Sequence, residues 1–188
     1  MADDTPRADA PTPVVVARLR EALPDAIEGV EQELPVPIVR IRRERIVEAC
    51  RFLKEDAACA LTLLSDLCGV DRIGLAPGEP RFEVVYQLFS VAHHHRLRLK
   101  ASVAEGAEIA TVSGVWRTAN WHEREAYDMF GIRFAGHPDP RRILMPEDFD
   151  AFPLRKDFPL EGRTQDHGYW RKPEDEAREG AVVAERKG

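Results

Sequence analysis

The clearest pattern along the chain is a strict alternation of apolar and polar residues over 96–103. The apolar side of this run consists of Leu97, Leu99, Ala101 and Val103. Such alternation is typical of an antiparallel strand with one face in the core and the other in water. The run 82–91 also has an apolar face, and the short link at His93–His95 predicts that the two strands form a hairpin.

Three other stretches place apolar residues at helical spacing. They are 14–23, 43–56 and 113–130. Pro24 stops the first helix, and Gly131 follows the third in the position favoured after a helix C-terminus. Residues 35–41 and 61–70 have the pattern of strands. We therefore expect an α+β fold for 14–132, a two-layer domain with a mainly antiparallel sheet and helices on one face.

The periodic spacing of apolar residues ends at Gly131. Over 133–163 large apolar residues alternate with charges and prolines, so neither a regular helix nor a separate core can form. We expect this extended ribbon to dock on a partner protein, because it holds more apolar anchors than a small sheet can cover. The alternative is a strap folded back over its own domain. The expected anchors and charged clamps are Ile143, Leu144, Phe152, Phe158, Arg142, Arg155 and Lys156.

Composition and charge narrow the classes of function. A net charge of −6 argues against a nucleic-acid surface, which is usually basic. No stretch approaches the roughly 20 apolar residues needed to span a bilayer, and no signal-peptide segment follows the acidic, Pro-rich N-terminus. We therefore expect attachment to a membrane only through other proteins, on its cytoplasmic side. Residues 1–13 are expected to be disordered, and the charged tail 164–188 to be loosely ordered.

The three cysteines, Cys50, Cys59 and Cys68, lie nine residues apart without a C-x-x-C pair. Fe–S and zinc sites usually need thiolates set closer together. We expect all three to be buried thiols that act as small hydrophobes.

Two groups of histidines suggest metal sites, but the residues next to them in the sequence support neither site. His93–His95 could bind a metal together with a carboxylate, which would fit a metal-dependent hydrolase, but solvated histidines at a hairpin tip are the simpler interpretation. The pair His122-Glu123 resembles the start of a zinc-protease helix, yet Ala126 occupies the position that needs the second histidine.

The carboxylates Glu123, Glu125 and Asp128 could serve as general acid and base. No nucleophile accompanies them, and Arg124 can bond Asp128 one helical turn away, so a structural charge network is the better interpretation. The chain also lacks the glycine-rich loops that hold nucleotides. We expect no catalytic residue, cofactor site or metal site on this chain.

The same region resembles the signature of the 30-kDa (NuoC-type) subunit family of respiratory complex I, the bacterial NADH–quinone oxidoreductase. The family pattern combines an E-R-E triplet with an acid, two apolar residues, a histidine or lysine, a basic residue and two further apolar residues at fixed spacing. Here these positions are Glu123-Arg124-Glu125, Asp128, Met129-Phe130, His137, Arg141 and Ile143-Leu144. The resemblance is specific over about 120–163 and continues through RRILMPEDF and PLRKDFPLEG.

The resemblance implies a structural subunit in the peripheral arm, beside the quinone-site subunit (D) and the terminal Fe–S subunit (B). The complex would pass electrons from NADH through FMN and Fe–S clusters to quinone, with those cofactors on partner subunits. Related modules occur in membrane-bound hydrogenases and in quinone reductases with other donors, so such a subunit is one alternative. The others are the metal-dependent hydrolase and a soluble adaptor unrelated to respiration.

Overall fold

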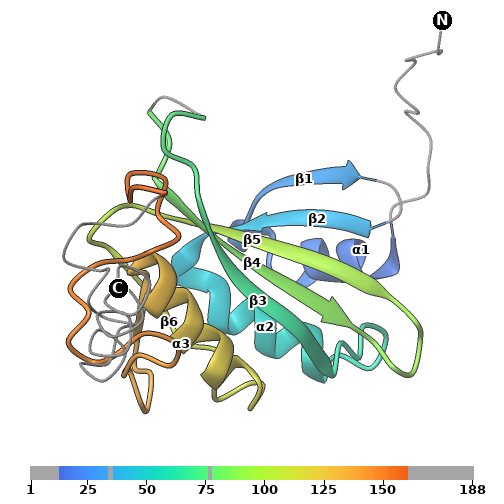
Figure 1. Cartoon of the computed structure of the whole chain (residues 1–188). Coiled ribbons are helices and arrows are strands. Elements are labelled where there is room, and N and C mark those ends of the chain that lie inside the picture. The colour runs from blue at the N-terminus through green and yellow to red at the C-terminus, as the bar shows by residue number, and fades with distance from the viewer. Residues whose placement is uncertain (1–12, 34–35, 76–77, 161–188) are drawn as a thin grey trace, which may run out of the picture.

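The domain is built on one five-stranded sheet, seen from its outer face in Figure 1. The computed structural model describes residues 13–33, 36–75 and 78–160. The strands are β1 (Ile27–Glu33), β2 (Val36–Ile41), β3 (Leu63–Asp71), β4 (Phe82–Phe89) and β5 (Arg96–Val103). Their order is β1-β2-β5-β4-β3, and every neighbouring pair is antiparallel except β2–β5. The mainly antiparallel sheet and the β4–β5 hairpin are therefore confirmed.

Three helices cover the inner face of this sheet (Figure 1). They are α1 (Val14–Ala22), α2 (Ile46–Glu55) and α3 (Ala119–Phe130). Short 3-10 turns, Pro24–Ala26 and Arg43–Arg45, precede β1 and α2. The α+β class with helices on one face is confirmed. Within the described residues, no helix has the length and apolar character to span a bilayer.

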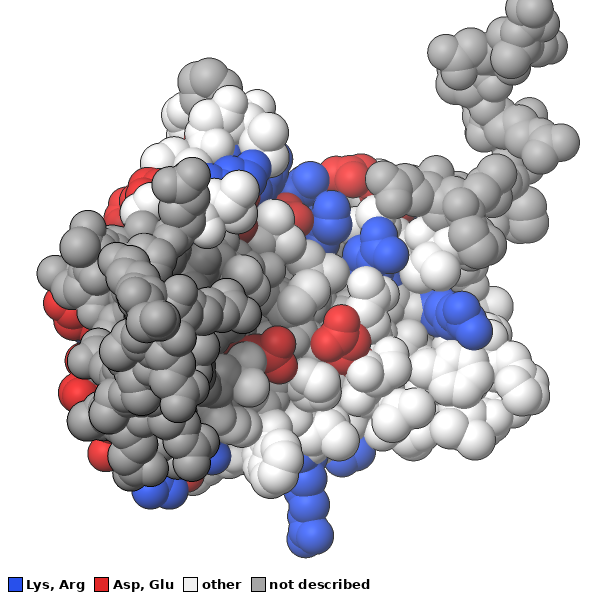
Figure 2. All heavy atoms as spheres, viewed as in Figure 1, with Lys and Arg blue, Asp and Glu red and all other residues white. Residues whose placement is uncertain are grey.

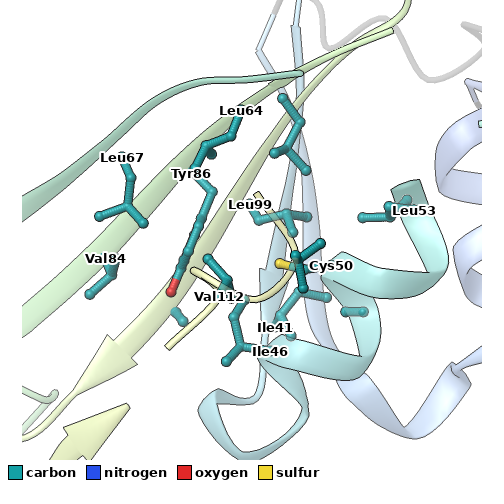
Figure 3. Close-up of a cluster of buried hydrophobic side chains, with 14 of the residues drawn as sticks. Ile41, Ile46, Cys50, Leu53, Leu64, Leu67, Val84, Tyr86, Leu99 and Val112 are labelled. Carbon is teal, nitrogen blue, oxygen red and sulfur yellow. The ribbon is translucent and has the colours of Figure 1, made fainter. Parts of the chain in front are cut away.

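The core lies between the sheet and α2, as Figure 3 shows. Ile41, Leu64, Val84 and Leu99 reach into it from four different strands, and Cys50 reaches in from α2. Each of these side chains is almost completely buried, which the alternating strands and the helical stripe require. The core also holds the labelled residues Ile46, Leu53, Leu67, Tyr86 and Val112.

The outer face of the sheet carries a row of basic side chains. Figure 2 shows Lys and Arg side chains running diagonally across this face, with Asp and Glu side chains near them. Their charge is balanced at Glu83, whose side chain lies almost fully buried among them. Its Oε1 accepts from Arg40 at 2.8 Å and lies 3.4 Å from Arg72, while Oε2 lies 3.5 Å from Lys100.

Some elements differ from the sequence pattern. That pattern does not predict β1, because β1 is a polar edge strand with little apolar alternation. Strands β6 (Glu108–Ala110) and β7 (Arg133–Ala135) form a small parallel pair, so the domain extends past residue 132 into the segment predicted to be ribbon. Cys68 is exposed, so the prediction of three buried thiols was wrong for that residue.

Two predicted segments lie largely outside the described residues. These are the disordered N-terminus 1–13, of which only Pro13 is described, and the charged tail 164–188.

Candidate functional site

The family-like motif lies on α3 and on the segment 136–160, which we call the strap; Figure 1 shows it in orange beside α3. Helix α3 ends at Gly131, whose φ of 76° is left-handed and whose N–H donates to the Tyr127 carbonyl. A side chain there would also clash, since a Cβ would lie 2.6 Å from Arg155 Nη2 and 2.7 Å from the Phe152 ring. Only glycine satisfies both conditions, so the strap can pack directly against the helix end.

Asp128 is the centre of the contact between α3 and the strap. Its side chain is fully buried, and Oδ2 accepts the backbone N–H groups of Ile143, Leu144 and Met145 at 3.0, 2.7 and 2.8 Å. Its Oδ1 accepts from Arg142 Nη1 at 2.6 Å. Burial acts to raise the pKa of Asp128, but the N–H groups and the guanidinium outweigh it and hold the pKa below its usual value. The carboxylate therefore stays charged while it binds four donors from the strap.

Arg142 extends this network along the strap. Its Nη1 also donates to the Asp128 carbonyl at 3.1 Å, and its Nη2 donates to the Ala151 carbonyl at 3.0 Å. The guanidinium lies 5.1 Å from the centroid of the Phe152 ring, and only 10% of the side chain is exposed. Arg142 thus joins two parts of the strap to the helix.

Arg124 holds the beginning of the strap. Its Nε and Nη2 donate to the carbonyls of Arg141 and Arg142, both at 2.9 Å, and Nη1 lies 3.4 Å from Asp139. The predicted Arg124–Asp128 pair was wrong, because each residue instead binds a different part of the strap. Helical spacing made the pair possible, but the tertiary contacts compete with it.

A second buried carboxylate, Asp71 at the end of β3, holds the far end of the strap. Its Oδ2 accepts the Lys156 N–H at 2.9 Å and pairs with Arg81 at 3.0 Å. Burial opposes ionisation of Asp71, but these donors keep its pKa below the usual value.

Arg155, next to Lys156 on the strap, makes further contacts with the domain. Its Nε donates to the Phe130 carbonyl at 2.6 Å, and its Nη1 pairs with Glu105 at 3.1 Å. The sequence motif gave no signal for Asp71, Arg81 or Glu105.

The strap therefore folds back over its own domain, the alternative to partner docking that the sequence left open. Phe149 is 4% exposed, and Phe152 packs edge-on against Tyr127 with ring centroids 6.1 Å apart. Phe158 and Ile143 are half-buried. Among the predicted docking residues, the exposed ones are Glu125, Arg141, Leu144 and Lys156. Docking on a partner stays a prediction for these outward-facing side chains.

Glu123 lies on the other side of α3, fully buried beside the β6–α3 connection. Its Oε1 accepts the Val112 N–H at 2.7 Å, and its Oε2 lies 2.5 Å from Thr111 Oγ1. Burial raises the pKa of Glu123 to about 7, although both hydrogen bonds lower it. This carboxyl can therefore hold or release a proton near neutral pH.

His137 neighbours Glu123, with its Nε2 3.8 Å from Glu123 Oε2. The Nε2–H donates to the Asn120 carbonyl at 3.0 Å, and Nδ1 accepts the Asp139 N–H at 3.0 Å. The predicted signature histidine is thus a structural tie between α3 and the strap. A cavity of about 260 Å³ opens beside Glu123, His137 and Arg124.

The turn at His93–His95 does not join this site. His93 Nε2 lies 2.9 Å from the Ala57 carbonyl, and the His93 and His95 ring centroids are 5.4 Å apart. Within the part of the chain that the structure describes, no three His, Cys, Asp or Glu side chains gather as metal ligands would.

Comparison with known proteins identifies relatives over most of the chain. Residues 39–164 match the family described as respiratory-chain NADH dehydrogenase, 30 Kd subunit. A C-type subunit of the NADH-quinone oxidoreductase of Rhizobium etli (strain CIAT 652) is 53% identical over 146 residues, which cover 78% of this chain and 76% of that protein. The corresponding protein of Roseiflexus castenholzii (strain DSM 13941 / HLO8) is 48% identical over 168 residues, which cover 86% of this chain and 95% of that protein.

A solved structure has the same fold. A chain in the structure of the membrane-bound sulfane sulfur reductase, an archaeal respiratory membrane complex, matches with a TM-score of 0.65 and 25% sequence identity. The match covers 78% of this chain and 84% of that chain.

Replacing Asp128 should release the strap. Asp128→Ala leaves Arg142 and three backbone N–H groups without their buried acceptor, so we expect the free energy of unfolding to fall by about 3–5 kcal/mol. Urea unfolding measures this loss, and limited proteolysis should show faster cleavage within 136–160. Glu125→Ala, an exposed acid on the same helix, is the matched control and should change neither. Equal behaviour of the two variants would contradict the assigned role of Asp128.

Neutralising Glu123 should change how stability depends on pH. Its folded pKa of about 7 lies above the ordinary value of 4.5, so its stabilising contribution is complete below pH 4 and is lost as the pH rises through 7. Between pH 5 and pH 8 the wild type should therefore lose roughly 2–3 kcal/mol of stability that Glu123→Gln retains. Urea titrations at both pH values test this, with Glu125→Gln as control. Parallel pH profiles of wild type and Glu123→Gln would contradict it.

Proposed function

Because the chain belongs to the 30-kDa subunit family of respiratory-chain NADH dehydrogenase, we propose that it is a peripheral-arm subunit of an NADH–quinone oxidoreductase. The observation that carries this proposal is the match over residues 39–164, which includes the whole of α3 and the strap. The proposed role is structural: the chain helps to assemble the arm, and the complex passes electrons from NADH to quinone.

The proposed partners are the quinone-site subunit (D) and the terminal Fe–S subunit (B). FMN and the Fe–S clusters would belong to partner subunits, and the chain would attach to the cell membrane peripherally, on the cytoplasmic side. The relatives are named as subunits of an oxidoreductase, which supports membership in such an assembly. The resemblance of the motif supports the choice of these two partners.

The strap is the proposed docking element, through its outward face. Leu144 and Leu154 are 57% and 55% exposed, although hydrogen bonds hold the backbone at both. The Leu144 N–H is held by Asp128, and the Leu154 N–H donates to the Met129 carbonyl at 3.1 Å. A backbone that is already ordered loses less entropy on binding, so these two leucines suit a protein interface. Arg141 and Lys156 are exposed on the same strap and can pair with partner carboxylates.

Purification of the assembly tests both the proposal and the docking surface. The tagged chain should co-purify from solubilised membranes with the quinone-site and terminal Fe–S subunits, identified by mass spectrometry. Leu144→Asp and Leu154→Asp should each reduce this co-purification, because burying such a leucine contributes roughly 1.5–3 kcal/mol. Both variants should keep the wild-type melting temperature, because these side chains are exposed in the free chain.

Val91→Asp is the control, since Val91 is 60% exposed on the distant β4–β5 turn. It should leave co-purification unchanged. Recovery of the wild-type chain without any oxidoreductase subunit would contradict the proposed function. Normal co-purification of both leucine variants would contradict the docking surface alone.

A further inference from the structure

A second surface, away from the outward leucines of the strap, has the properties of a protein-binding groove. An open groove of about 670 Å³ lies where α2 meets the N-terminal end of α3. Val47 and Arg51 of α2 line one side, and Arg117, Asn120 and Trp121 line the other. The beginning of the strap also borders this groove, so segments far apart in the sequence form it together.

Trp121 is the most distinctive residue of this groove. Its side chain is 70% exposed, although an indole carries one of the largest apolar surfaces of any residue. The helix beneath it is firmly fixed, because Ala119 and Glu123 on either side of Trp121 are fully buried. An exposed tryptophan on a firmly fixed helix is the kind of residue that dominates binding energy at protein interfaces. It therefore indicates an interface rather than an ordinary solvent-exposed position.

The charge of the groove indicates what kind of partner it binds. Arg51 and Arg117 both line it and are exposed, whereas no carboxylate is among the lining residues that the structure describes. Within residues 13–33, 36–75 and 78–160, neither guanidinium has a hydrogen bond or an ion pair. The basic residues on the outer face of the sheet differ, since Arg40, for example, is paired with Glu83 at 2.8 Å. Two such arginines beside an exposed indole favour an acidic binding partner.

We propose that this groove binds an acidic polypeptide segment of another subunit of the assembly. Trp121 packs against an apolar part of that segment, and Arg51 and Arg117 pair with its carboxylates. The proposal rests on the proposed function for the existence of the assembly, but it concerns a surface distinct from the exposed leucines of the strap. It assigns the N-terminal end of α3 a contact in addition to those of the strap.

Photo-cross-linking in the purified assembly tests the occupant directly. p-Benzoyl-L-phenylalanine is introduced at residue 121 of the full chain, and mass spectrometry identifies the cross-linked peptide. The expected product is a peptide of another subunit in which carboxylates flank the cross-linked residue. The inference is overturned by the absence of a cross-link, or by a cross-link to lipid, to a peptide without carboxylates, or to residues 161–188 of this chain.

Substitutions measure the contribution of each group. When variant and wild-type chains are co-expressed and compete for the assembly, Trp121→Ala should be incorporated about 30-fold less than wild type. The double variant Arg51→Glu/Arg117→Glu should show a similar loss. Arg20→Glu/Arg42→Glu changes the net charge equally at exposed arginines outside the groove and should compete normally.

Circular dichroism and melting temperature of the free variants exclude a folding defect as the cause. Normal incorporation of Trp121→Ala and of the Arg51/Arg117 double variant would overturn the inference, and the proposed function would stand. Absence of the wild-type chain from the purified assembly would overturn the proposed function and this inference together.

Discussion

The buried carboxylate of Asp128 is the group on which the arrangement of the strap depends. Segment 136–160 has neither helix nor strand, so its backbone N–H groups have few partners of their own. Ordering each residue of such a segment costs about 1–2 kcal/mol of backbone entropy. Three consecutive N–H groups and Arg142 converge on one carboxylate, which offsets part of that cost. At the C-terminal end of the strap a second buried carboxylate, Asp71, likewise accepts a backbone N–H, that of Lys156.

Two fully buried acids on the same helix show how surroundings determine charge. Asp128 faces four donors from the strap and stays ionised, with a pKa below its ordinary value. Glu123 has the Val112 N–H and the Thr111 hydroxyl close by but no cation, so burial dominates and raises its pKa to about 7. His137 Nε2 lies 3.8 Å from Glu123 Oε2, and the two ring nitrogens bond the Asn120 carbonyl and the Asp139 N–H. One acid therefore binds the strap electrostatically, and the other is tolerated in the core close to its neutral form.

Local periodicity predicted the elements that depend on local sequence. The alternation in β5 and the helical stripe of α2 follow directly from which residues must be buried, and both lie where expected. β6 and β7 could not be found this way, because each has three residues and their pairing joins positions 108 and 133. The motif pointed to residues that the structure brings together on α3 and the strap, but not to their partners. Arg124 could bond Asp128 by helical spacing, yet both bind the strap, and no local pattern reports such a tertiary contact.

The contacts of Asp128 imply that the strap is ordered by its own domain before any partner binds. Hydrogen exchange of the Ile143, Leu144 and Met145 amides measures this most directly, because all three donate to Asp128. We expect strong protection of these amides in the free, full-length chain at neutral pH, and little further protection in the assembled complex. Rapid exchange in the free chain, with protection only in the complex, would contradict this order of events and would mean that the partner orders the strap.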